Sequence, residues 1–333
     1  PDLFGRVFPY DLRLQGHDII RTWLFSSVVR AHHEHGSLPW TDAALSGWIL
    51  DPDRKKMGKS TGNALVPTDL LEAHGSDAVR YWAANGRLGT DTAFDEGQMK
   101  VGRRLAVKLL NASKFALGFP EAAAGPVTEP VDRALLARLA AVVEEATTAF
   151  DGYDYTRALE RTESFFWSFC DDYIELVKGR AYGEDAAAAA SANRALRLAL
   201  DTLLRLFAPF LPFVTEEVWS WWKEGSVHAQ PWPDAAEVRA AAGAAPDGLD
   251  PLDLAAVVLE RVRGEKSRAK VSMKTPVLAL HATGSAEELA VLAQVETDLR
   301  NSCLIESLTT EDGDAGFEVT RIELGDPPPK QPK

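Results

Sequence analysis

A helical repeat of apolar residues, nearly continuous from Asp95 to Trp222, constrains the fold more than any other feature of this sequence. Within it, apolar residues recur at three- and four-residue spacing. Four segments carry the repeat: 95–117, 131–150, 154–181 and 190–222. Pro209 and Pro212 predict a kink or tight corner over 208–213. Because no strand pattern interrupts this stretch, the sequence predicts an antiparallel helix bundle.

Short strands and helices alternate on both sides of the predicted bundle, which is the α/β pattern. Before it, we expect strands at 12–15 and 44–50 and helices at 18–35, 70–74 and 77–84. Ser76 is expected to be the N-cap of the last of these helices. A linker rich in Ala, Gly and Pro follows the bundle at 231–251 and holds at most one short helix. Beyond it we expect helices at 252–270 and 286–301 and strands at 277–281, 303–308 and 317–324.

The chain of 333 residues has room for two or three domains. We expect four regions: a partial nucleotide-binding, Rossmann-like α/β fold over 1–94, an all-α bundle over 95–235, a small α/β unit over 236–326, and a disordered tail over 327–333. The two cysteines, Cys170 and Cys303, lie far apart and form neither a disulfide framework nor a zinc pattern. No apolar stretch reaches the ~20 residues that span a bilayer. These features predict a cytoplasmic protein without a membrane partner.

The formal net charge of −13 argues against a general nucleic-acid coat protein or a binder of anionic membranes. The positive charges are nevertheless concentrated in three places: 54–59, 100–114 and 261–274. A phosphate group interacts with the local charge rather than with the total. Binding to RNA or to a nucleotide therefore remains open.

The densest of these clusters, 54–59, has four cations in six residues and precedes small and hydroxyl residues. Lysine supplies mobile positive charge, and glycine lets backbone N–H groups approach a phosphate closely. A P-loop is excluded because Asp53 stands where that motif requires glycine. Taken alone, the cluster fits either a polyphosphate site or a solvated basic loop.

Several motifs in order carry a resemblance to a known family. The segment Lys56-Met57-Gly58-Lys59-Ser60 resembles the KMSKS signature of class I aminoacyl-tRNA synthetases. The segment beginning Gly16-His17-Asp18-Ile19 resembles the Gly-x-Asp turn that opens a helix beneath the adenylate in the valine, isoleucine and leucine enzymes. Further matches follow in the family's order at 75–82, 108–115, 209–219 and 231–233.

The resemblance covers about residues 3–325 and is strongest to the valyl-tRNA synthetase family. Its Gly-His-Asp-Ile segment and the Gly-Trp-Ile-Leu-Asp-Pro-Asp segment at 47–53 favour valine over isoleucine or leucine. Two positions depart from the family pattern. Gly58 replaces the usual serine, and Thr61 stands where lysine is common. Both departures leave the two signature lysines in place.

The resemblance implies that ATP, accompanied by Mg²⁺, activates valine to valyl-adenylate, and that valine is then transferred to the 3′ end of tRNA(Val). It assigns catalytic roles to three residues: Lys56, Lys59 and Ser60. The lysines would neutralise charge growing on the leaving pyrophosphate, and the serine would donate a hydrogen bond. The residues implied in binding ATP or the adenylate are Gly16, His17, Asp18, Met57 and Gly58. No metal ligand is implied.

Asp18 and Ile19 are the candidates for the amino-acid pocket. The carboxylate of Asp18, expected where a strand ends and a helix begins, could accept hydrogen bonds from ribose hydroxyls or from the amino group of valine. Two alternatives stay open. Asp18 could be a helix N-cap, and Ile19 could be a core residue.

Contacts with tRNA require local positive charge. The candidates on the first bundle helix are Lys100, Arg103, Arg104 and Lys108, and those in the C-terminal unit are Arg263, Lys266, Arg268 and Lys270. For each of them a solvated surface position is an equal alternative. The bundle is expected to bind splayed, single-stranded anticodon bases.

A complete synthetase of this class also needs an HIGH signature, and no such motif occurs in this sequence. We therefore expect the chain to correspond to the C-terminal part of such an enzyme, without the N-terminal half of the catalytic fold and the editing domain. By itself it would then be catalytically incomplete. The alternative is a stand-alone, synthetase-like module that binds tRNA without ligase activity.

Overall fold

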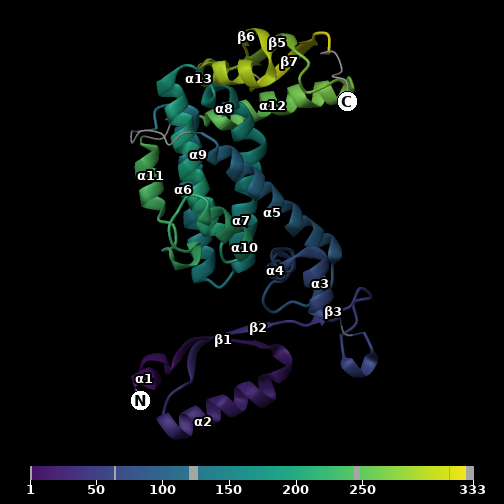
Figure 1. Cartoon of the computed structure of the whole chain (residues 1–333), viewed down its shortest axis with the longest axis vertical. Helices are drawn as coiled ribbons and strands as arrows, with labels where there is room; N and C mark the ends of the chain where they lie inside the picture. Colours follow the sequence, from purple (N-terminus) through teal and green to yellow (C-terminus); the bar gives the residue numbers. More distant parts are fainter. Residues whose placement is uncertain (1, 64, 120–126, 244–247, 315, 328–333) are drawn as a thin grey trace. The chain divides into compact units, whose positions relative to one another are not determined.

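The computed structural model describes residues 2–63, 65–119, 127–243, 248–314 and 316–327 (Figure 1). The side chains of Asp2 and Lys59 lie outside this description, as does nearly all of the tail expected at 327–333. The chain divides into two compact units, each assembled from separate stretches. Unit one comprises Pro1–Leu109, Ala146–Glu160 and Phe207–Glu217, and unit two comprises Leu110–Glu145, Arg161–Leu206 and Val218–Lys333.

Unit one begins with α1 (Asp2–Val7) and a pair of parallel strands, β1 (Tyr10–Gly16) and β2 (Trp40–Ser46). The connection between the strands contains α2 (Phe25–His35). This arrangement confirms the expected strand at 12–15. The expected helix over 18–35 is helical throughout, but its first part is a 3-10 turn and a π turn rather than α-helix.

The single strand expected at 44–50 is two strands in separate sheets. The second, β3 (Ile49–Leu50), pairs in parallel with β4 (Thr92–Ala93). The break occurs at Gly47, where an added Cβ would lie 2.2 Å from the backbone oxygen of Thr90. Only glycine permits this close approach of two backbone segments.

Helices α3 (Pro67–His74) and α4 (Ser76–Ala84) follow, separated at Gly75, whose φ of 86° ends the first helix. The expectation that Ser76 caps α4 is wrong: Gly75 occupies the N-cap position, and no side chain caps the helix. A small core joins α4 to the start of α5 (Glu96–Leu117), where Trp82 and Met99 are buried.

The predicted helical stretch is confirmed. Its helices after α5 are α6 (Pro130–Asp151), α7 (Tyr155–Ser168), α8 (Ile174–Ala181), α9 (Ala186–Phe207) and α10 (Pro212–Ser220), and the described residues between 96 and 220 contain no strand. A π turn at 169–173 joins α7 to α8. The corner predicted over 208–213 lies between α9 and α10, where the backbone oxygen of Phe207 accepts from the N–H groups of Phe210 and Leu211.

Unit two also contains α11 (Ala235–Ala242), the short helix allowed in the linker. The small α/β region consists of α12 (Pro251–Arg268), α13 (Ala286–Cys303) and a sheet of order β6-β5-β7 (Ile305–Asp312, Val277–Gly284 and Glu318–Leu324). Strand β5 is parallel to β6 and antiparallel to β7. Asp250 caps α12, and Ser285 with Glu288 forms a capping box at α13.

A buried charge network attaches this α/β region to the bundle within unit two. Arg180 of α8 donates through Nη2 to Asp132 of α6 at 2.7 Å and through Nε to Asp298 of α13 at 3.1 Å. Tyr173 donates to the same Asp132 carboxylate at 2.8 Å. All four side chains are almost fully buried. Helix α13 therefore packs against α8 with its buried Asp298 carboxylate paired to Arg180.

A membrane-spanning helix would need a longer apolar stretch than any helix in the described ranges offers.

Candidate nucleotide and tRNA sites

The Gly16-His17-Asp18 segment forms the 3-10 turn directly after β1. An added Cβ at Gly16 would lie 2.8 Å from Oδ1 of Asp18, so the carboxylate folds back over the glycine. His17 contacts the backbone oxygen of Ser46, at the end of β2, through Nδ1 at 3.1 Å. The turn therefore lies at the carboxyl end of both parallel strands, which is where α/β folds bind ligands.

Both alternatives for the candidate amino-acid pocket are wrong in this structure. No side chain caps the 3-10 turn, so Asp18 does not act as an N-cap. Ile19 is 37% exposed and is not a core residue. Asp18 is exposed as well. Both side chains are accessible to a ligand.

The basic loop, defined as residues 52–62, brings Lys56 to this turn. The Nζ of Lys56 lies 3.9 Å from Oδ2 of Asp18 and 4.1 Å from the centre of the Trp48 ring. The ring of His17 lies 4.7 Å from the same tryptophan. Trp48 therefore supports the lysine by a cation–π contact. Sequence reasoning used Trp48 for family resemblance and missed this contact.

Other signature residues have different environments. Lys59 and Ser60 begin a 3-10 turn, and the side chain of Ser60 is exposed. Met57 and Gly58 are half-buried. Among the described contacts, none joins Ser60 to the Gly16–Asp18 turn. The structure thus brings Lys56 and Asp18 together and leaves Ser60 accessible on the loop.

Two polar residues that sequence reasoning did not select hold the base of the loop. Asp51, at the end of β3, is 7% exposed and accepts from the backbone N–H of Lys55 and from Nδ2 of Asn63, both at 2.8 Å. These hydrogen bonds hold the pKa of the Asp51 carboxyl below its ordinary value. Two features of the sequence could have indicated this pair: a carboxylate directly after a predicted strand and an amide at the far end of the loop.

The tRNA candidates on α5 form a stripe. Lys100, Arg104 and Lys108 are four residues apart, so they share one side of the helix. Arg103 lies beside the stripe and donates to the backbone oxygen of Ala73 at 3.1 Å. Lys100, Arg103 and Arg104 are exposed, and Lys108 is half-buried. The stripe presents positive charge along two turns of helix.

The candidates in the C-terminal α/β region separate into two groups. Lys266 is 2% exposed, and its Nζ donates to the backbone oxygens of Met273 and Cys303 at 3.0 Å. Burial lowers its pKa. The expectation that Lys266 contacts a phosphate is therefore wrong in this structure, because its charge supports a turn in the interior.

Arg263 has a side chain that is 37% exposed and pairs with Asp172 at 3.2 Å, so its charge is already compensated at the surface. Arg268 pairs with Glu265 but stays exposed, and Lys270 is exposed with a φ of 54°. Arg268 and Lys270 are the most exposed candidates of this region.

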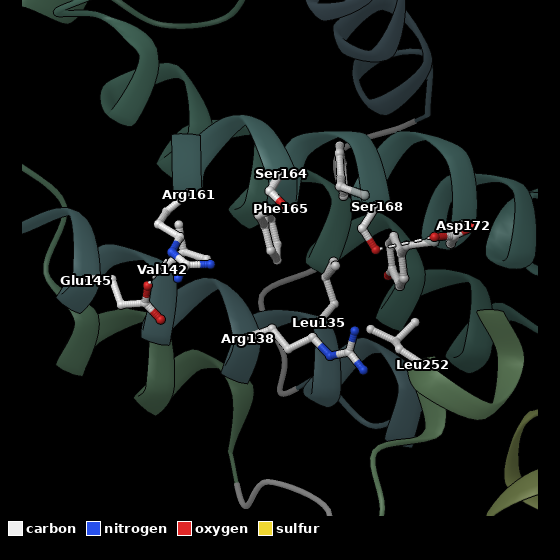
Figure 2. A pocket seen from close by; sticks show the side chains of 12 residues that line it. Leu135, Arg138, Val142, Glu145, Arg161, Ser164, Phe165, Ser168, Asp172 and Leu252 are labelled. Carbon is white, nitrogen blue, oxygen red and sulfur yellow. Dashed lines mark hydrogen bonds and ion pairs between the residues drawn. The ribbon is translucent and has the colours of Figure 1, made fainter. Parts of the chain in front are cut away.

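Unit two has a cleft between α6 and α7 (Figure 2). It has an apolar floor that includes Leu135 and Phe165 and a charged rim. The rim charges are compensated, since Arg161 pairs with Glu145 at 3.0 Å and Arg138 pairs with Asp250 at 2.5 Å. None of the predicted site residues lines this cleft.

The described residues contain no group of three or more His, Cys, Asp or Glu side chains that could hold a metal ion. A magnesium ion typically uses one or two carboxylates together with substrate phosphates. Asp18 is the available carboxylate in the site, since both Asp51 oxygens are already used by the loop. The residues present fit a Mg²⁺ ion that is held mainly by the phosphates of ATP.

Two family models match this chain. The model of class I tRNA synthetases (I, L, M and V) matches residues 2–95, and the model of the anticodon-binding domain of tRNA ligase matches residues 132–281. The first match contains the Asp18–Lys56 site. The second contains most of the bundle and the start of the C-terminal α/β region.

Structural neighbours support the fold alone, since their sequence identities are low. The LeuRS of Agrobacterium radiobacter, in a ternary complex with tRNA and LeuAMS, has a TM-score of 0.56 at 16% identity, covering 98% of this chain and 40% of that one. The methionyl-tRNA synthetase of Mycobacterium tuberculosis with methionyl-adenylate has a TM-score of 0.55 at 24% identity, covering 66% of this chain and 45% of that one.

Several sequence relatives are much closer, and they are named valine–tRNA ligase. The relative from Salinispora tropica is 58% identical over 97% of this chain, that from Thermobifida fusca 60% over 96%, and that from Cutibacterium acnes 54% over 100%. The chain spans 36–40% of the length of these relatives. By motif order, family models and relatives, this chain belongs to the valine–tRNA ligase family of class I tRNA synthetases.

Proposed function

We propose that this chain forms part of a valine–tRNA ligase, which activates valine with ATP and transfers it to the 3′ end of tRNA(Val). The single observation that carries the proposal is the 3.9 Å approach of Lys56 to Asp18 at the carboxyl end of β1. It joins the basic loop and the Gly-His-Asp turn, which are 38 residues apart in sequence, in the segment that matches the class I family.

In valine activation the substrate carboxylate attacks the α-phosphorus of ATP, an acyl–phosphate bond forms, and pyrophosphate leaves with the bonding electrons. The negative charge that grows on the β- and γ-phosphates must be neutralised. We assign this role to Lys56 and Lys59, with Ser60 donating a hydrogen bond. Mg²⁺ bound to the phosphates would add further positive charge.

The turn after β1 would hold the nucleoside and the amino acid. Gly16 leaves space for the Asp18 carboxylate, which would accept from ribose hydroxyls or from the amino group of valine. Ile19 would contact the valine side chain. The half-buried backbone of Met57 and Gly58 would lie along the nucleotide.

A further segment of the ligase would complete this site. Leu14 on β1, and Trp23 and Phe25 in the connection between β1 and β2, are each more than half exposed. Exposed apolar side chains on a two-stranded sheet are typical of a surface that another segment covers. We propose that residues 1–94 contribute one part of a Rossmann-like catalytic domain and that HIGH-bearing residues contribute another.

The remaining regions would bind tRNA(Val). The bundle, proposed over 95–235, would receive the anticodon, and the stripe of Lys100, Arg104 and Lys108 would contact phosphates. Arg268 and Lys270 of the proposed 236–326 unit are the second phosphate candidates. Such a ligase works in the cytoplasm, in agreement with two free, buried cysteines, Cys170 and Cys303.

The test uses a chimeric ligase, in which this chain replaces the matching segment of the Salinispora tropica relative. We expect valine-dependent ATP–pyrophosphate exchange by the chimeric ligase and none by the 333-residue chain alone. If the folded chimera binds tRNA(Val) but does not exchange, the proposed catalytic role fails and the alternative, a tRNA-binding module, is favoured. Exchange by the chain alone would contradict its incompleteness.

A further inference from the structure

The side chains of Asp51 and Asn63 join the two ends of the basic loop. Nδ2 of Asn63 donates to Oδ2 of Asp51 at 2.8 Å, and the other Asp51 oxygen accepts from the N–H of Lys55. The backbone adds a second closure at the base, because the N–H of Asp51 donates to the oxygen of Lys55 at 2.8 Å. The loop is therefore closed at its base by hydrogen bonds between its own residues and Asp51.

Asn63 also pairs with the backbone on both sides of Met57. Its Oδ1 accepts from the N–H of Gly58 at 3.0 Å, and its Nδ2 donates to the oxygen of Lys56 at 3.3 Å. A side-chain amide has an accepting carbonyl oxygen, as a peptide unit does, and an NH₂ group with two donor hydrogens. The Asn63 amide therefore pairs with backbone N–H and C=O groups around Met57, as a neighbouring strand would.

The same amide oxygen reaches the second half of the signature. The hydroxyl of Thr61 lies within hydrogen-bond distance of Oδ1 of Asn63 and of the oxygen of Gly58, at 2.5 and 2.8 Å, and can donate its one hydrogen to either of them. These contacts of the Thr61 hydroxyl hold the 3-10 turn that begins at Lys59. The backbone on which Lys56 and Lys59 are carried is thus connected to one side chain, Asn63, and through it to β3.

We propose that Asp51 and Asn63 are a positioning pair for the signature loop, which sets the backbone path of both lysines before a polyphosphate binds. The proposal rests on the proposed function of that loop. Both side chains are occupied by hydrogen bonds to the loop, so they act through Lys56 and Lys59 rather than on the nucleotide. Because the loop is already ordered, the binding free energy of the nucleotide is not reduced by the entropy cost of ordering the loop.

Three variants and one control separate this role from general stability. Asn63→Ala removes every bond of the amide. Asp51→Asn places two amide donors against each other, and the exchange Asp51→Asn with Asn63→Asp restores a donor–acceptor pair between the positions. Asn85→Ala is the matched control, since Asn85 also donates from Nδ2 to a backbone oxygen, that of Tyr81 at 2.9 Å, but lies outside the loop.

The first measurement is amide hydrogen exchange on the 333-residue chain, which needs no activity. We expect the amides of Lys55 and Gly58 to exchange at least about tenfold faster in Asn63→Ala than in the unaltered chain. The Asn85→Ala control should leave them unchanged, and the double exchange should recover protection at Lys55. Equal exchange in Asn63→Ala and the unaltered chain would overturn the proposal.

The second measurement is valine-dependent ATP–pyrophosphate exchange by the chimeric ligase. Asn63→Ala should raise the KM for ATP about tenfold and leave the KM for valine within about twofold. Faster amide exchange with an unchanged KM for ATP would mean that the pair stabilises the loop without positioning it, which overturns the proposal. An inactive unaltered chimera would instead refute the proposed function, while the amide exchange still decides whether the pair holds the loop.

Discussion

The Arg180 network makes the sharpest stability prediction, because one cation holds two buried carboxylates. Arg180 contacts Asp132 through Nη1 and Nη2 at 2.8 and 2.7 Å, and it contacts Asp298 through Nε at 3.1 Å. The Asp132 side chain is 0% exposed and that of Asp298 is 7% exposed. Arg180→Met would keep the apolar volume and leave both carboxylates without their cation.

Removing one partner of a buried ion pair costs about 3–5 kcal/mol of unfolding free energy. We expect Arg180→Met to lie in this range at pH 7, measured by urea unfolding followed by circular dichroism. Arg300→Met is the matched control, because Arg300 pairs with Glu296 at 2.7 Å on the same α13 with side chains about one-third exposed. We expect Arg300→Met to lower the free energy of unfolding by less than about 1 kcal/mol.

The dependence on pH gives a second check. Burial raises the pKa of Asp298 above its ordinary value, and the nearby Arg180 opposes this rise. Without Arg180 the pKa should rise further. A carboxyl whose pKa is raised on folding stabilises the folded state at a pH below its unfolded-state pKa. This stabilisation is lost as the pH rises through its folded-state pKa. The destabilisation by Arg180→Met should therefore be smaller near pH 4 than at pH 7. If Arg180→Met lowers the free energy of unfolding at pH 7 by no more than Arg300→Met does, the reasoning is refuted.

Two other predictions concern the sites in unit one. Replacing Lys100, Arg104 and Lys108 by glutamine should weaken tRNA binding by the chain and lower the slope of log K against log[salt], while Arg30→Gln on α2 should not; an unchanged slope would mean that the stripe makes no phosphate contacts. The lowered pKa of Asp51 implies that amide protection at Lys55 is complete above pH ~4 and is lost only as the pH falls through the lower folded value. Hydrogen exchange as a function of pH measures this loss, and a loss already complete above pH 5 would contradict it.

Sequence periodicity predicted the helical stretch well because burial of one helix face is a local pattern. Leu196, Leu200 and Leu203 of α9 are all at most 1% exposed, as three- and four-residue spacing requires. The break at Gly47 was not predictable, since it depends on a contact with distant backbone. At Gly47 the deciding neighbour is Thr90, which lies 43 residues away.

The charged residues show the same limit at the sites. Lys56 and Asp18 were each selected from motifs, and their contact agrees with those motifs. Lys266 was selected from a run of cations, yet its Nζ binds the backbone oxygen of Cys303, 37 residues further on. A charge pattern along one helix does not reveal what another segment supplies. For the same reason the Asp51–Asn63 pair appeared only once the loop was folded.

In the proposed ligase, the basic loop neutralises the leaving pyrophosphate during valine activation. The single-turnover rate of valyl-adenylate formation by the chimeric ligase, at saturating valine and ATP, tests this role most directly. We predict that Lys59→Ala lowers this rate by about 100-fold or more and barely changes the affinity for valine. An unchanged rate in a folded Lys59→Ala chimera would contradict the account.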